Sequence, residues 1–160
     1  MRTWNNRSKE ISFLFNPAYC GKILYFTIKK YNEISKKGNF PFALIYLVLR
    51  ILLYPQSIEK INVRTRFSKF VNDNPELLID FAQRSKNLIT ITNEAIEFLM
   101  AGRAIDINQN ATFCCVEEIQ NSKNEIVKKA EAIGKMFANA GTVNVIYLML
   151  GVKPWCKLKK

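Results

Sequence analysis

The sequence predicts a mainly α-helical protein with a small β-hairpin, in which a helical bundle is combined with a winged-helix-like unit. Three observations predict this fold class: apolar residues recur at helical spacing over most of the chain, two short β-branched runs lie between residues 103 and 116, and three helices precede them. The chain has 160 residues, of which 49% are hydrophobic and 23% charged, so it can bury its own core. We expect a single domain over residues 1–160, divided into a basic helical part (1–72) and a winged-helix-like part with C-terminal helices (73–160).

The first helix is expected to begin near residue 17. Asn16 can cap the free amides of this helix, and Pro17 suits its first position. The stretch Lys36–Asn39, which contains a glycine, predicts where the helix ends. The expected buried face has helical spacing and consists of Tyr19, Cys20, Ile23, Leu24, Phe26, Ile28 and Tyr31.

The most apolar run of the chain, Phe40–Tyr54, is expected to form a buried helix that begins at Pro41 and ends before Pro55. The run is shorter than the ~20 residues that a membrane-spanning helix needs. Arg50 interrupts it, and an unpaired buried charge is costly. We therefore expect a carboxylate or a carbonyl partner for Arg50.

The middle of the chain is expected to contain two further helices. Residues Ser57–Asn72 form the first, whose apolar face comprises Val63, Phe67, Phe70 and Val71. Asn74 and Pro75 repeat the cap-and-proline signal and predict a second helix that continues to about Lys86.

A helix and a hairpin are expected next. Thr92 can cap a helix that ends at Gly102 and buries Ala95, Ile96 and Leu99. The runs Arg103–Gln109 and Ala111–Val116 then predict a β-hairpin. Together with the preceding helices, this hairpin is typical of a winged helix.

The C-terminal part is expected to be helical. Ser122 and Glu125 have the spacing of a capping box. We expect Gly134 and Gly141 to allow close packing of helices, with a hinge as the alternative. The expected apolar stripe is Ile126, Ala130, Ile133, Phe137 and Ala140, and the closing residues are Gly151 and Pro154.

No catalytic, cofactor-binding or metal-binding residues are predicted. The sequence has no histidine, which excludes the usual Ser/His/Asp and Cys/His nucleophile systems and imidazole ligands for zinc. The four cysteines, Cys20, Cys114, Cys115 and Cys156, contain no CxxC pair. The sequence also contains no Walker A, GxGxxG or GxSxG motif.

The positive charge of the chain is concentrated in its first half. Residues 1–72 carry 13 Lys and Arg against three Glu, a net charge of +10, whereas residues 73–160 carry 11 against 10 acids, a net charge of +1. This asymmetry predicts an acidic partner, such as nucleic acid, a membrane surface or an acidic protein face, and a solvated basic surface is the alternative. The candidate DNA- or partner-binding residues are Lys22, Lys29, Lys30, Lys36, Lys37, Arg64, Arg66 and Lys69.

Sequence-specific DNA reading is disfavoured. In a winged helix, the helix before the hairpin would enter the major groove. Here that helix, Thr92–Ala101, carries Glu94 and Glu97 and no cation, so it would repel phosphate. The N-terminal residues MRTWNNRSKEIS lack the apolar region of a signal peptide, and we expect a cytoplasmic protein with reduced thiols and no membrane contact.

Five motifs, in this order and spacing, resemble one family over about residues 13–154. They are FNPAYC at 15–20, RILLYP at 50–55, VRTRFSKF at 63–70, NPELLIDFAQR at 74–84, and GKMFANAGTV followed by LGVKP within 134–154. The family comprises the middle components of bacterial three-component ABC systems, including Lamassu-type modules that act against phages and plasmids. The chain departs from the resemblance at Tyr54, where relatives often carry a histidine.

The resemblance implies a non-enzymatic adaptor in a defence complex. Its partners would be an ABC ATPase related to SMC proteins and an effector, often a nuclease. The basic half adds an expected non-specific contact with double-stranded DNA. The alternative is a free-standing winged-helix regulator that binds DNA as a homodimer.

Overall fold

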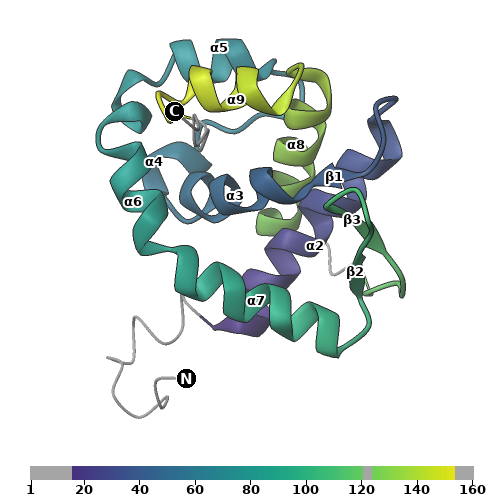
Figure 1. The fold of residues 1–160 in the computed structure, drawn as a ribbon. Helices are drawn as coiled ribbons and strands as arrows, with labels where there is room; N and C mark the ends of the chain where they lie inside the picture. Colours follow the sequence, from purple (N-terminus) through teal and green to yellow (C-terminus); the bar gives the residue numbers. More distant parts are fainter. Residues whose placement is uncertain (1–15, 121–123, 154–160) are drawn as a thin grey trace, which may run out of the picture.

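The computed structural model describes residues 16–120 and 124–153 and is mainly helical with a small antiparallel sheet, as the sequence predicts (Figure 1). The longest helix, α2, runs through the middle of the molecule and packs against α7 and α8. The helices are α2 (Pro17–Ile34), α3 (Ile45–Leu52), α4 (Pro55–Ile58), α5 (Phe67–Asn72), α6 (Phe81–Asn87), α7 (Ile89–Ala101), α8 (Glu125–Asn139) and α9 (Val143–Met149), with short 3₁₀ helices at Phe42–Leu44 and Pro75–Leu78. The strands are β1 (Phe40–Pro41), β2 (Ile105–Ile107) and β3 (Thr112–Cys115).

Helix α2 begins where the sequence predicts. The side chain of Asn16 accepts a hydrogen bond of 2.9 Å from the backbone amide of Ala18, and Pro17 is the first helical residue. From Ile23 to Ile28 every residue of α2 is buried, because other elements cover the helix on several sides. Tyr19, which was expected on the buried face, is 37% exposed.

Helices α2 and α8 approach each other closely at Gly134. A Cβ atom at this position would overlap the backbone oxygen of Thr27 and lie 3.1 Å from the Cβ of Lys30. The hydroxyl of Thr27 is completely buried and donates to the carbonyls of Ile23 (2.9 Å) and Ala130 (3.3 Å). The expectation of close helix packing is thus met at Gly134, whereas Gly141 forms the turn between α8 and α9 with a φ of +108°.

The predicted hairpin forms, and the structure adds a third strand to it. β2 and β3 pair antiparallel, and β1 pairs with the other edge of β3 in the order β1-β3-β2. Pro41, expected to begin a helix, is therefore a strand residue, and α3 begins only at Ile45. The cause is Asn32 of α2, whose amide nitrogen donates to the carbonyl of Phe113 (3.0 Å) and whose oxygen accepts from the amide of Phe40 (2.7 Å).

The prediction of one helix over Ser57–Asn72 is wrong. The segment forms the short α4, a turn region and α5, and Val63 is 51% exposed instead of buried. The side chain of Asn62 accepts from the amide of Arg64, which stabilises a turn where the expected helix would continue.

The two helix starts expected at Asn74 and Thr92 also need correction. The side-chain amide nitrogen of Asn74 donates to the carbonyl of Phe70, and the side chain makes no capping hydrogen bond. The 3₁₀ helix that follows is separated from α6 by Ile79 and Asp80, and the φ of Asp80 is +52°. Thr92 lies inside α7, where its hydroxyl donates to the carbonyl of Leu88. The predicted buried residues Ala95, Ile96 and Leu99 and the helix end at Gly102 are confirmed.

The C-terminal helices follow the sequence pattern closely. In the expected stripe of α8, Ala130, Ile133 and Phe137 are buried and Ile126 and Ala140 half-buried. Asn124 occupies the cap position of α8, and both Ser122 and Pro154 lie outside the described residues. Gly151 follows α9 with a φ of +67°. Within the described ranges, no helix has the length and hydropathy to cross a bilayer. The winged-helix-like unit and the single domain over 1–160 stay predictions.

We expect Gly134→Ala to lower the free energy of unfolding by about 1–3 kcal/mol, because overpacking against backbone atoms cannot be relieved by a side-chain rotation. This cost exceeds the ~1 kcal/mol by which alanine favours a helix interior over glycine. The control is Gly21→Ala in α2, where the new Cβ would meet the Cγ of Leu99 at 3.3 Å, a side-chain atom that can shift. Urea unfolding of both variants measures the difference, and equal stabilities would contradict the proposed close contact.

Candidate partner- and anion-binding surfaces

The structure divides the predicted basic residues among three places. On α2, Lys29 pairs with Glu118 at 3.0 Å and Lys30 with Glu33 at 2.9 Å. The hydrogen bond that the ammonium of Lys29 donates to Glu118 raises the pKa of Lys29. The charges of Lys29 and Lys30 are therefore partly neutralised. Lys22, on the same helix, also interacts with another group. The contact with Glu118 was not predicted, because Glu118 is 89 residues from Lys29 in the sequence and reaches α2 only through the fold.

Lys36 and Lys37 lie in the second place, the loop after α2, where both are exposed. Lys37 lines a pocket of about 480 Å³ between this loop, the hairpin turn and the α8–α9 turn. Asn108, Asn110 and Thr142 also line it, together with the apolar side chains of Pro41 and Val143. Neither lysine has an ion-pair partner among the described residues, which leaves both available to an anionic surface.

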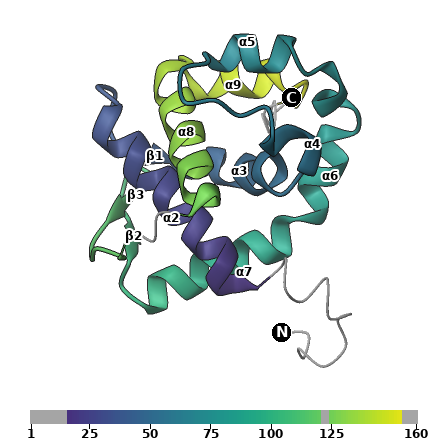
Figure 2. The same ribbon diagram turned by 180° about the vertical axis from the view of Figure 1, so that it is seen from behind.

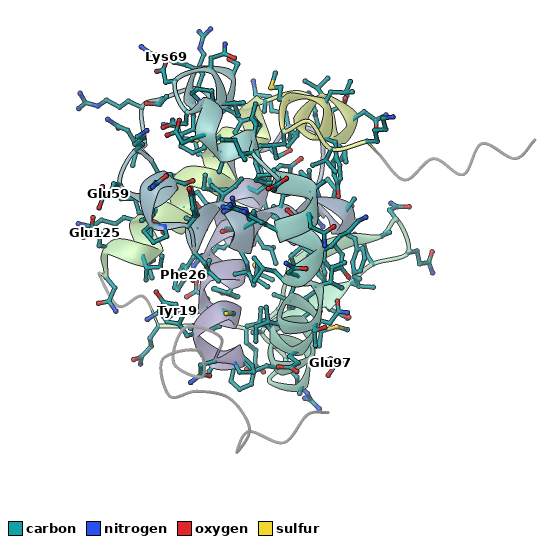
Figure 3. The ribbon with its side chains drawn as sticks, turned by 90° about the vertical axis from the view of Figure 1, so that its left-hand side faces the viewer. Tyr19, Phe26, Glu59, Lys69, Glu97 and Glu125 are labelled. Carbon is teal, nitrogen blue, oxygen red and sulfur yellow. The ribbon has the colours of Figure 1, made fainter. Side chains whose placement is uncertain are left out.

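The third place is a groove that we call the basic groove. It has a volume of about 470 Å³ and lies between the loop before α5, the C-terminal half of α8, and α9. Two of the predicted residues, Arg64 and Arg66, line it together with Lys135, which the sequence analysis missed. Its remaining lining residues are Val63, Thr65, Ser68, Met136, Asn139, Ala140 and Met149. Lys69, the last predicted residue, is exposed on α5 at the same end of the molecule (Figure 3).

The walls of the basic groove are held by contacts that link distant segments. The ring of Phe67 packs edge-on against that of Phe137, with 5.2 Å between the centroids, and fixes α5 on α8. The ammonium of Lys129 donates to the carbonyl of Ile61 (2.8 Å), which anchors the loop before α5. The groove is therefore shaped by the fold rather than by a flexible loop alone.

Helix α7 and the hairpin present a different surface. Five exposed apolar side chains lie on α7 or at the ends of the hairpin strands, and we use the name α7–hairpin surface for this set: Ile89, Phe98, Met100, Ile107 and Val116. Around α7, Phe98 faces away from Ile89 and Met100. Other apolar side chains, including Ile79 and Leu148, are exposed elsewhere. Asn93, the residue of α7 best suited to reading a base, already accepts a hydrogen bond of 2.9 Å from the hydroxyl of Tyr46. Glu97 points away from the helix bundle (Figure 3). An apolar and acidic surface of this kind suits a protein partner better than a phosphate backbone.

Arg50 has an environment that the sequence analysis did not expect. Its side chain is 4% exposed, and its Nε and Nη2 atoms have no hydrogen-bond partner among the described residues. Instead of a carboxylate, it meets the ring of Tyr54, 4.4 Å from the centroid, and that of Phe81 at 5.5 Å. Burial and the positive charge of Arg84 lower its pKa. Arg50 is thus a buried cation stabilised by aromatic faces.

Cys20 and Cys115 have raised thiol pKa values. Burial is the main cause that raises the pKa of the Cys20 thiol to about 12 and that of Cys115 to about 11. A reactive cysteine needs the opposite shift, toward the thiolate at neutral pH. Among the described residues, no group of three or more Cys, Asp and Glu side chains is placed to hold a metal ion.

The described surface features are of the kind that contacts other macromolecules: a cationic groove at one end, and exposed apolar side chains on α7 and the hairpin. Residues 4–154 match the family model of ABC-three component (ABC-3C) system Middle Component 3, and the chain belongs to this family. Being a middle component of such a system implies partner subunits. No curated protein and no solved structure matches the chain.

We expect Arg50→Met to leave the free energy of unfolding unchanged or to raise it, by up to about 1–4 kcal/mol, because an apolar side chain of similar length avoids the desolvation of a buried charge. Urea unfolding measures this. The control is Arg84→Met, an exposed cation near the same Tyr54 ring, which should change stability by less than about 0.5 kcal/mol. A loss of more than about 1 kcal/mol in Arg50→Met would show that its ring contacts outweigh its desolvation.

Proposed function

We propose that this chain is a non-enzymatic adaptor that links an SMC-like ABC ATPase to an effector, such as a nuclease, in a Lamassu-type or related bacterial defence complex. The observation that carries the proposal is the presence of two separate surfaces with different chemistry. Helices α5 and α9, which border the basic groove, lie at one end of the molecule, and α7 lies at the other end (Figure 2). Family membership supports the presence of partner subunits.

The α7–hairpin surface supports a protein contact because exposed apolar side chains lose water on binding. Phe98 is 51% and Val116 57% exposed, and both are large enough to contribute to an interface. The position of this surface, away from the basic groove, leaves both surfaces accessible at the same time. Simultaneous access is what a subunit needs if it is to connect two others.

A second candidate function is non-specific contact with double-stranded DNA through the basic half. The net charge of +10 over residues 1–72 supports it, as does the exposure of Lys36, Lys37 and Lys69. A free-standing DNA-binding regulator is the alternative to the adaptor. It would require a homodimer with sequence-selective binding, and the acidic helix α7 argues against it.

We expect the chain, tagged at its native locus and purified gently, to carry an SMC-like ATPase and an effector with it in fixed ratios. Mass spectrometry identifies these subunits, and native mass spectrometry gives their ratios. A variant with Phe98→Asp and Val116→Asp should lose one of the two subunits, because burying a carboxylate in an apolar interface is costly. Recovery of a lone homodimer bound to DNA would overturn the adaptor proposal in favour of the regulator.

We expect the isolated chain to bind a duplex of mixed sequence with an affinity that falls with salt, with a slope of about −0.9 per phosphate contact in a log–log plot. Fluorescence anisotropy measures this. Lys36→Glu with Lys37→Glu should reduce the slope by about 2, one unit for each lost contact. The charge-matched control, Lys86→Glu with Arg103→Glu, alters exposed cations elsewhere and should change the slope less. Binding that does not depend on salt would exclude the phosphate contact.

A further inference from the structure

We propose that the basic groove binds a segment of a partner subunit in which a carboxylate side chain lies next to an apolar one. This inference rests on the proposed adaptor function and specifies the chemistry of one of its contacts. It is drawn from three features of the groove: its charge, its rigidity, and the apolar part of its lining formed by Met136, Ala140 and Met149, which we call its floor.

The positive charge of the groove favours an anionic ligand. Arg64, Arg66 and Lys135 line it, and among its described lining residues there is no carboxylate. Neither arginine has an ion-pair partner in the described part of the chain. The planar guanidinium groups can hold a carboxylate by two parallel hydrogen bonds, and partial removal from water strengthens such bonds.

The floor of the groove favours an apolar group beside that anion. Met136, Ala140 and Met149 contribute to the lining, and Val63 is 51% exposed at its edge. Methionine side chains adapt to apolar partners of different shape. A ligand that met only the cations would leave this apolar surface unused.

The groove is also largely formed before anything binds. The Phe67–Phe137 ring contact and the hydrogen bond from Lys129 to Ile61 hold its two walls. The turn that presents Arg64 is closed by the side chain of Asn62, which accepts from the amide of Arg64 at 3.1 Å. A rigid site loses less conformational entropy on binding than a flexible one.

These features favour a protein segment over a DNA duplex. The volume of about 470 Å³ can hold a few side chains but not the backbone of a duplex with its grooves. Contact with a phosphate backbone relies on cations and is independent of an apolar floor. A segment with an Asp or Glu beside an apolar residue would contact both the cations and the floor of the groove.

The experiment places a benzophenone-bearing amino acid at position 63, the exposed edge of the groove, in the tagged chain expressed from its native locus. After irradiation of the intact complex, mass spectrometry identifies what has been cross-linked. We expect a single segment of one co-purified subunit, with an acidic residue adjacent to an apolar one. The same amino acid placed at position 83, an exposed site on α6, is the control and should not label that segment.

A synthetic peptide of the cross-linked segment then tests the chemistry by fluorescence anisotropy. Arg64→Gln with Arg66→Gln should weaken its binding about tenfold or more, as should replacement of the acidic residue of the peptide by alanine. Lys86→Gln with Arg103→Gln is the matched control. Circular dichroism confirms that the variants fold, and Arg64→Gln alone serves if the double variant does not.

The outcomes separate this inference from the function on which it rests. Cross-links to nucleic acid alone, to a segment without acidic residues, or to nothing in an intact complex would overturn the inference and leave the adaptor function standing. Equal peptide binding by the groove variants would also overturn it. Failure to recover any partner subunit would overturn both.

Discussion

The contact between α2 and α8 at Gly134 is the constraint on which the rest of the structure depends. Helix α2 is buried on several sides, because α3, α7, α8 and the strands β1 and β3 all pack against it. At Gly134 the two backbones approach so closely that only a residue without a side chain fits. Thr27 uses the same proximity, because its buried hydroxyl donates to carbonyls of both helices. A glycine in a helix interior costs stability, and here the cost is offset by the area that the close packing buries.

This contact also sets the position of the basic groove. Lys135 and Met136 follow Gly134 directly along α8, so the register that Gly134 imposes determines which side of α8 faces α5. One turn further, Phe137 receives the ring of Phe67. The groove is therefore built on the rigid end of the same helix pair that forms the core. A binding site supported in this way keeps its shape when unoccupied, which favours recognition of a short segment.

Local signals predicted most of the fold, and tertiary contacts account for what they missed. Asn16, Gly102 and the hairpin were predictable because capping and turn preferences act within a few residues. β1 was not, because its two residues are held by Asn32 and by a strand far along the chain. The same reason explains the missed contributions of Glu118 and Lys135, which reach their sites through tertiary packing. Val63 was assigned to a core because its apolar side chain fits a helical pattern that the Asn62 turn interrupts.

The fold divides the positive charge of the first half of the chain among separate places. Along the sequence, residues 1–72 form one polycationic stretch. In the structure the fold pairs part of this charge with Glu33 and Glu118, buries Arg50 against aromatic rings, and presents Lys36 and Lys37 on a separate loop. Arg64 and Arg66 remain exposed, and the fold adds Lys135 from the nearly neutral second half to them. Because exposed charges are screened by solvent while grouped charges in a groove act together, the proposed anion contact is assigned to this small cluster rather than to the larger total charge.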